Sequence, residues 1–185
     1  MDKRIIVFIG PPFAGKDTQT GLLAEKMSMP VFSMGALIRE AYGKGDPKAI
    51  EGFENYSMKG LHLPASLKFH LLREKLDLLE GGYILDNFPA NKEDLDVFMK
   101  YLRDKDREID KVFYLKIDES EMERRLTERG RKDDNIEVVR KRRRLQDADR
   151  EYLVNRFREL SLLEEIDGGR SIDDVQREIA KKLEI

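Results

Sequence analysis

The stretch "RIIVFIGPPFAGKDTQ", residues 4–19, joins a buried β run to a glycine-rich loop and the start of a helix. A loop in this setting exposes backbone N–H groups and the positive helix end, so an anion can sit there without long side chains. Gly10, Gly15 and Lys16 match the pattern GxxxxGK. Asp17 stands where the strict pattern has serine or threonine, and Thr18 follows it. The stretch predicts a phosphate-binding cradle.

Composition limits the class of protein. The 185 residues are 40% hydrophobic, which suits one compact domain. Cysteine is absent, so no disulfide framework or thiolate metal site is available, and a cytoplasmic location is expected. The 35 basic and 37 acidic residues argue against a protein that coats nucleic acid, and no apolar run is long enough to span a bilayer. We expect a monomer or small homo-oligomer that binds neither nucleic acid nor membrane.

Short β runs alternate with helical stretches along the rest of the chain. This alternation is typical of a parallel sheet wrapped by helices, and we expect one domain over residues 1–185. Residues 40–63 break the rhythm with glycine, proline and polar residues, and are interpreted as an insertion outside the sheet. The expected strands lie at 4–10, 30–33, 82–86, 111–118 and 162–169, and the expected helices at 17–27, 64–82, 119–129, 135–160 and 171–185.

The loop "GPPFAGKDTQ" resembles that of the adenylate kinases and their relatives, the nucleoside monophosphate kinases, where one residue separates the lysine from Thr-Gln. The resemblance covers nearly the whole chain. It includes "FSMGALIRE" (32–40), "SMKGLHLP" (57–64), "GYILDNFPANKEDLDVF" (82–98) and "MERRLTERGRKDDNIEVVRKRR" (122–143). It implies a P-loop NTPase-type three-layer α/β/α fold with a five-stranded parallel sheet. The acceptor-nucleotide-binding insertion would span about 34–64, and a vestigial lid about 129–134.

On the donor side, the resemblance implies an ATP site with Mg²⁺. Lys16, Arg129, Arg131 and Arg142 would surround the phosphoryl group in transit, and Arg125, with Arg129, would contact the donor nucleotide. Asp86 and Thr18 would hold the metal. The other donor contacts implied are Gly10, Pro11, Phe13, Ala14, Gly15, Asp17 and Gly169. Phe13 and Asp17 each replace a usual glycine. Because phenylalanine tolerates positive φ poorly, the loop must either keep ordinary dihedral angles there or store strain.

On the acceptor side, Arg39 would grip the phosphate of the incoming nucleotide. The other acceptor contacts implied are Ser33, Met34, Gly60, Leu63, Phe88 and Asp94. Met34 and Asp94 replace the family's adenine-reading threonine and glutamine, although Asp94 could accept from an exocyclic amine. Ala90 replaces an arginine that holds the acceptor phosphate, and either Lys68 or Arg73 could compensate.

The function implied is phosphoryl transfer from ATP to AMP, giving two ADP. Asn91 is also common in uridylate and cytidylate kinases, so a pyrimidine nucleotide kinase is an alternative. Two further alternatives are a nucleotide-binding regulatory protein of the same fold with reduced activity, and a kinase of another small molecule. The basic run at 140–144 is interpreted as a solvated helix face, and His62 and His70 as structural or surface residues.

Overall fold

A five-stranded parallel sheet forms the centre of the protein, as the sequence predicts. The computed structural model describes residues 2–59, 61, 63–129 and 136–185. The strands run in the order β2-β3-β1-β4-β5, so the order reverses at β1 and opens a crevice at the carboxyl ends of the strands. Their bounds are β1 Ile5–Ile9, β2 Val31–Ser33, β3 Tyr83–Asp86, β4 Lys111–Lys116 and β5 Leu163–Asp167.

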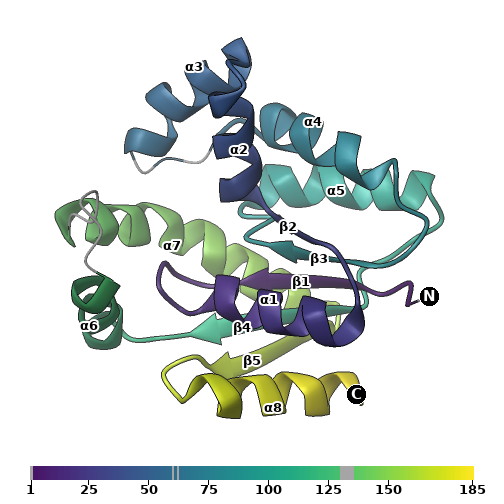
Figure 1. Cartoon of the computed structure of the whole chain (residues 1–185), viewed down its shortest axis with the longest axis vertical. Coiled ribbons are helices and arrows are strands. Elements are labelled where there is room, and N and C mark those ends of the chain that lie inside the picture. The colour runs from purple at the N-terminus through teal and green to yellow at the C-terminus, as the bar shows by residue number, and fades with distance from the viewer. Residues whose placement is uncertain (1, 60, 62, 130–135) are drawn as a thin grey trace.

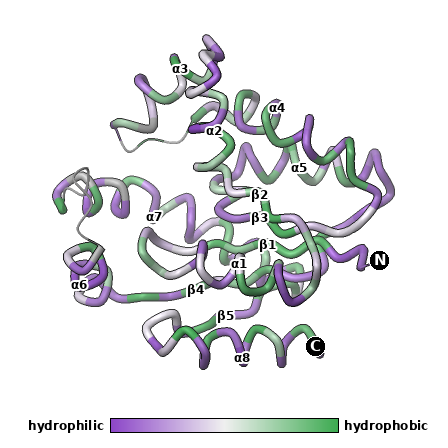
Figure 2. The backbone as a smooth tube through the Cα atoms, in the orientation of Figure 1, coloured by the Kyte–Doolittle hydropathy of each residue, from purple (hydrophilic) through white to green (hydrophobic). Residues whose placement is uncertain are grey.

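Helices cover both faces of the sheet and complete three layers (Figure 1). Alternate residues of β1 enter two separate cores, because successive side chains of a strand point to opposite faces. Ile5, Val7 and Ile9 pack toward α4, α5 and α7, whereas Ile6 and Phe8 pack toward α1 and α8. The helices on the sheet are α1 Lys16–Met27, α4 Ala65–Leu76, α5 Lys92–Asp104, α6 Glu119–Arg129, α7 Ile136–Glu159 and α8 Ile172–Leu183. Figure 2 shows β1 hydrophobic along its length and hydrophilic residues dominating α6.

A helical lobe follows β2. It consists of α2 (Met34–Gly43), α3 (Pro47–Asn55) and the 3₁₀ turn Ser57–Lys59, and α3 stands away from the sheet (Figure 1). Asp46 starts α3 by accepting a hydrogen bond from the Ala49 amide at 2.9 Å, and Pro47 occupies the first helical position. The described residues of the stretch 40–63 form no strand of the sheet, and helix α3 within this stretch was not predicted.

The sequence-based expectations also miss helices α2 and α5 and misjudge the end of a third helix. Helix α5 was not predicted, although Asn91 caps it by accepting from the Asp94 amide and two acidic residues occupy its first turn. The helix expected to continue to residue 82 ends at Leu76. The charged stretch 135–160 forms α7, in which Arg140 pairs with Glu123 and Arg143 donates to the Ile117 carbonyl at 3.0 Å. These two arginines attach α7 to α6 and to the residue that follows β4.

Candidate active site

The loop between β1 and α1 encloses the ammonium group of Lys16. Lys16 Nζ donates to the carbonyl oxygens of Gly10 and Pro11, both at 3.0 Å. Gly10 has φ +153°, and a Cβ there would lie 2.5 Å from the Leu115 carbonyl oxygen, so the turn requires glycine. Burial lowers the pKa of Lys16, while the charges of Asp86 and Asp17 oppose that shift. The ammonium group of Lys16 is thus surrounded by the backbone of the loop at the amino end of α1, an arrangement that suits the binding of phosphate.

Phe13 adopts a left-handed backbone conformation, with φ 64°. Of the two outcomes the sequence left open, the loop therefore takes the strained one. The carbonyl oxygen of Phe13 accepts from Arg125 Nη1 at 3.1 Å. This hydrogen bond is one of the contacts that hold the strained residue in place.

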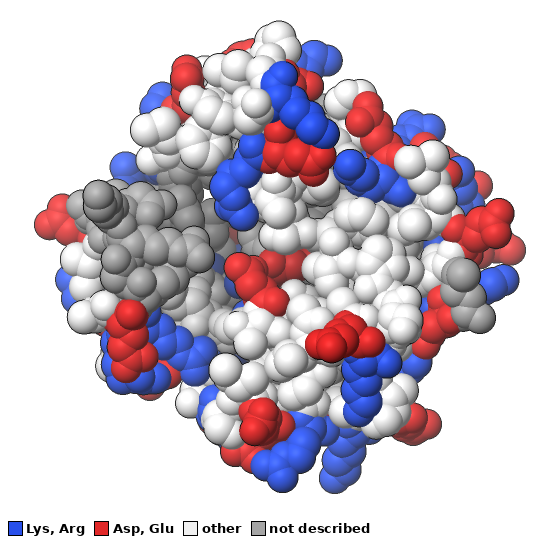
Figure 3. Space-filling model, viewed as in Figure 1, with Lys and Arg blue, Asp and Glu red and all other residues white. Residues whose placement is uncertain are grey.

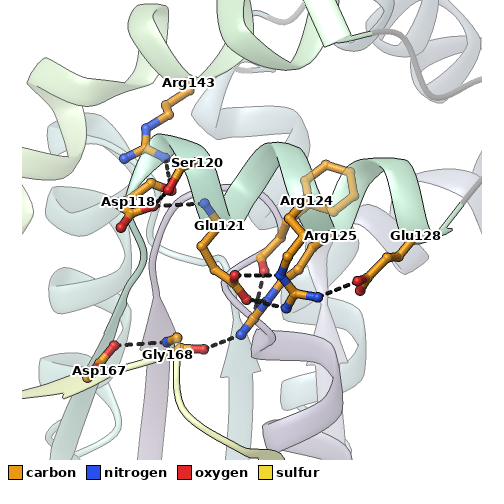
Figure 4. Close-up of polar contacts among 11 residues, drawn as sticks. Asp118, Ser120, Glu121, Arg124, Arg125, Glu128, Arg143, Asp167 and Gly168 are labelled. Carbon is orange, nitrogen blue, oxygen red and sulfur yellow. Dashed lines mark hydrogen bonds and ion pairs between the residues drawn. The ribbon is translucent and has the colours of Figure 1, made fainter.

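Arg125 ties three segments together (Figure 4). Besides Phe13, its guanidinium donates to the Gly168 carbonyl at 2.6 Å and to Glu121 Oε1 at 2.6 Å. Hydrogen bonds from Arg124 and Arg125 lower the pKa of Glu121 to about 2, so this carboxylate stays ionised and holds both guanidinium groups. Arg125 therefore links the cradle, α6 and the loop after β5. Its contact with the donor nucleotide stays a prediction.

A cavity of about 670 Å³ opens above the cradle. A Cβ on Gly168 would lie 2.9 Å from the Ala14 carbonyl oxygen, so the backbone of the loop after β5 passes close to the cradle at this residue. On the face seen in Figure 3, Lys and Arg are interspersed with Asp and Glu, which fits the small net charge. The cavity is lined by residues 13–19, by Arg124, Arg125 and Glu128, and by residues 168–172 and Val175.

Asp86 lies at the carboxyl end of β3, where the register places it beside Phe8 of β1 and Ser33 of β2. It is 2% exposed, and its Oδ1 has no hydrogen-bond partner among the described residues. Burial raises the pKa of Asp86 to about 7; the Lys16 charge opposes this shift and the Asp17 carboxyl adds to it. An unpaired carboxylate oxygen near a second carboxyl fits the oxygen ligands that Mg²⁺ prefers.

No group of three or more His, Cys, Asp or Glu side chains suited to a metal occurs in the described part of the chain. An ion held by Asp86 would thus complete its ligand shell with other oxygens. This suits Mg²⁺, which usually keeps several waters and binds substrate phosphates.

A second cavity of about 270 Å³ lies across the loop from the first. Met34, Ile38 and Leu63 give it a buried apolar wall, and the exposed Arg39 stands at its edge. Of the predicted acceptor contacts, Met34, Arg39 and Leu63 therefore line one cavity. The remaining lining residues are Gly10, Pro12, Lys16, Gly35, Phe53, Leu61, Lys68, Asn87, Ala90 and Gln146.

The structure places other predicted residues away from the cavities or outside its description. Phe88 is fully buried and packs on Phe98 with ring centroids 5.6 Å apart, and Asp94 is fully buried behind Lys68 and Ala90. Ser33 directly precedes α2 and lies beside Asp86 in the register of β2 with β3. Gly60, Arg131, most of the lid at 129–134 and the side chains of Arg129 and Arg142 lie outside the described residues.

Of the two residues expected to compensate for the arginine missing at Ala90, Lys68 lines the second cavity together with Ala90. Arg73, the other candidate, is exposed and pairs with Asp77 at 3.1 Å. Sequence reasoning did not find the ion pair of Lys68 with Asp94, because 26 positions separate the two residues and no local pattern links them. It also missed Asn87 and Gln146 as lining residues.

A glycine loop around a lysine, at the crevice of a parallel sheet and between two cavities, defines a P-loop nucleotide-binding protein. Residues 8–162 match the family model described as Adenylate kinase, and the chain belongs to that family. It is therefore an enzyme of the nucleoside monophosphate kinase class, as the sequence predicts.

Curated relatives agree with this assignment. The chain is 36% identical over 138 residues to the adenylate kinase of Corynebacterium aurimucosum, covering 74% of this chain and 76% of the relative. It is 34% identical over 156 residues to that of Mycolicibacterium smegmatis, with 83% and 86% covered. It is 32% identical over 181 residues to that of Prochlorococcus marinus strain MIT 9301, with 98% and 99% covered. Among the described residues, no helix combines the length and the apolar character needed to cross a membrane.

Proposed function

We propose that this protein transfers the γ-phosphoryl group of ATP to AMP, with the larger cavity as the donor site and the smaller as the acceptor site. The observation that carries the proposal is that Lys16 lines both cavities. One ammonium group can therefore interact with a phosphate chain entering from either side. Phosphoryl transfer needs this kind of shared positive charge where donor and acceptor phosphates meet.

The reaction asks for positioning and charge neutralisation rather than a protein base. A phosphate monoester is already largely ionised near neutral pH, since its second pKa is about 6. Lys16 and the amino end of α1 would bind the donor phosphates, and Arg39 the acceptor phosphate. Arg129, Arg131 and Arg142 are proposed to surround the group in transit, and Arg125 to hold the cradle against the loop after β5.

Asp86 and Thr18 are the residues proposed to hold Mg²⁺. When bound, the ion would neutralise charge on the phosphate oxygens. The unpaired Oδ1 of Asp86 supports this role, and Thr18 lines the donor cavity. The cytoplasmic location and the monomeric or small oligomeric state stay predictions.

The pyrimidine alternative loses one of its supports. Asn91, whose presence suggested uridylate and cytidylate kinases, caps α5 by accepting from the Asp94 amide at 2.9 Å. A role in starting a helix explains this residue without reference to the base. The regulatory alternative rests on Phe13, Asp17 and Ala90. A measurement of phosphoryl-transfer activity tests this alternative.

The test is NDP formation from Mg-ATP and, separately, AMP, CMP, UMP, GMP and dTMP. AMP should be converted, and Lys16→Met should lower kcat/KM by about a hundredfold or more, since it removes a charge that acts on the transferring group. Lys26→Met is the matched control, because Lys26 is exposed at the far end of the same helix. Absence of NDP with every acceptor, while ATP still binds, would reject the proposal in favour of the regulatory protein or of a kinase of another small molecule.

A further inference from the structure

Arg150 of α7 is a mostly buried arginine that lies behind one wall of the smaller cavity, which we assign to the acceptor. Its side chain is 11% exposed, whereas arginine is usually a surface residue. It lines a gap of about 10 Å³, room for about one water molecule, together with Gly10, Asn87 and Ala90. These three residues and Gln146 line the acceptor cavity as well. Arg150 therefore adjoins that cavity through the gap.

Helix α7 turns one of its faces toward this gap. Gln146 and Arg150 are four positions apart, so they lie on the same side of the helix. Leu153, which lines the same gap, is 1% exposed. The face that carries Arg150 therefore meets the protein interior, where a positive charge is costly without an anionic partner.

The partner that Arg150 has among the described residues is a weak one. Arg150 Nη1 donates to Asp147, three positions earlier, whose side chain is 53% exposed. An ion pair with an exposed partner contributes little, because water competes for the charges. A guanidinium carries five N–H donors, and within the described part of the chain only one donor of Arg150 is matched. Most of its hydrogen-bonding capacity is thus available to a ligand.

The charge of Arg150 also acts on Lys16. Burial lowers the pKa of the Lys16 ammonium and the positive charge of Arg150 lowers it further, while the charges of Asp86 and Asp17 oppose the shift. Lys16 donates to the carbonyl of Gly10, and Gly10 lines the gap beside Arg150. Two cations that repel each other at this distance both attract an anion placed between them.

We propose that Arg150 binds the phosphate of the acceptor nucleotide from the side of α7. The side chain of Ala90 is a single methyl group, so this part of the wall leaves room for the guanidinium to meet a phosphate in the cavity. Arg39 would contact the same phosphate from α2. A guanidinium suits this task, because its planar fork can donate two hydrogen bonds to one phosphate. The inference rests on the proposed function, since it takes the smaller cavity as the acceptor site.

Lys68, which also lines the acceptor cavity, is less suited to a phosphate. Lys68 Nζ lies 2.5 Å from Asp94 Oδ2, and the two side chains are 3% and 0% exposed. The charges of Asp149 and Glu93 act on the same ammonium. The positive charge of Lys68 is therefore offset by acidic groups in the interior, whereas that of Arg150 is offset by one exposed carboxylate.

The experiment compares calorimetric binding of AMP and of adenosine, without ATP, to the wild-type protein and to variants. Arg150→Met should weaken AMP binding by about tenfold or more, because charge-assisted hydrogen bonds to the phosphate are lost. Adenosine has no phosphate, and its affinity should change by less than about twofold. Arg150→Lys should recover part of the AMP affinity, since it keeps the charge and loses the fork. Arg156→Met is the matched control on the same helix, because Arg156 is exposed and pairs with Glu159, and it should leave AMP binding unchanged.

A second test moves the guanidinium to the other side of the gap. The double variant Arg150→Met/Ala90→Arg should bind AMP within about threefold of the wild type, since position 90 lines the same cavity. Unchanged AMP affinity in Arg150→Met, an equal loss of AMP and adenosine affinity, or no binding of AMP to the wild type would overturn the role of Arg150. Failure of the proposed function looks different, because AMP then binds and responds to Arg150→Met while no NDP forms.

Discussion

Removing one partner of the buried pair should destabilise the protein far more than removing both. Lys68→Met leaves the carboxylate of Asp94 buried, and among the described side-chain and backbone donors outside the pair the Ala90 amide alone donates to it. Loss of one partner from such a pair costs about 3–5 kcal/mol. For a domain of this size, each kcal/mol corresponds to about 2–4 °C in Tm. The expected drop is thus on the order of 6–20 °C.

The double variant Lys68→Met/Asp94→Leu should recover most of that loss. Burial raises the pKa of Asp94 and lowers that of Lys68, so the pairing does not fully offset the cost of taking both charges out of water. What remains lost is the hydrogen bond from the Ala90 amide, about 1 kcal/mol. The double variant should therefore be more stable than Lys68→Met alone.

Urea denaturation at equilibrium measures these differences, and pH provides a check on the cause. The unpaired Asp94 of Lys68→Met should have a folded-state pKa above its unfolded value. The penalty is then fully present above the folded pKa and disappears as pH falls below the unfolded one, so it should be smaller at pH 5 than at pH 8. The exposed Lys92–Asp96 pair is the control, and Lys92→Met should change the midpoint much less. A loss below about 1 kcal/mol in Lys68→Met, or a double variant no more stable than Lys68→Met, would contradict this account of the ion pair.

Two further predictions concern the donor side. Arg125→Met should weaken ATP binding by about tenfold or more, because it removes the hydrogen bonds to the Phe13 and Gly168 carbonyls. Arg177 is exposed, and Arg177→Met should leave the ATP affinity unchanged. Equal ATP affinities of the two variants in calorimetry would contradict this prediction. Burial raises the pKa of Asp86 to about 7 in the folded protein, so this group opposes folding above that pH and ceases to do so as pH falls toward its unfolded value. In metal-free protein, the free energy of unfolding of Asp86→Asn should therefore depend less on pH between about 4 and 7 than that of the wild type. A pH dependence that the substitution leaves unchanged in chemical denaturation would count against the raised pKa of Asp86.

The parts of the fold that sequence predicted correctly have signals within short stretches. The buried run 5–9, the glycine loop and α1 are contiguous, so hydrophobicity and the GxxxxGK spacing reveal them together. Helix α5 also carried local signals, an asparagine cap and an acidic first turn, and could have been predicted from them. Phe13 shows the limit of local reasoning. Its residue type makes positive φ costly, but the hydrogen bond to its carbonyl comes from Arg125, 112 positions away.

The fold class, the cradle and the family of this protein can be read from its sequence, because each follows from periodicity or from residues close together in the chain. Which cation lies near Ala90 depends on the packing of the helices. Lys68 and Arg73 lie on different faces of one helix, and their spacing does not say which face meets the cavity. The packing of α4 against α5 brings Lys68 to Asp94 and leaves Arg73 exposed. Contacts between distant segments depend on how helices pack, and no local pattern records that geometry.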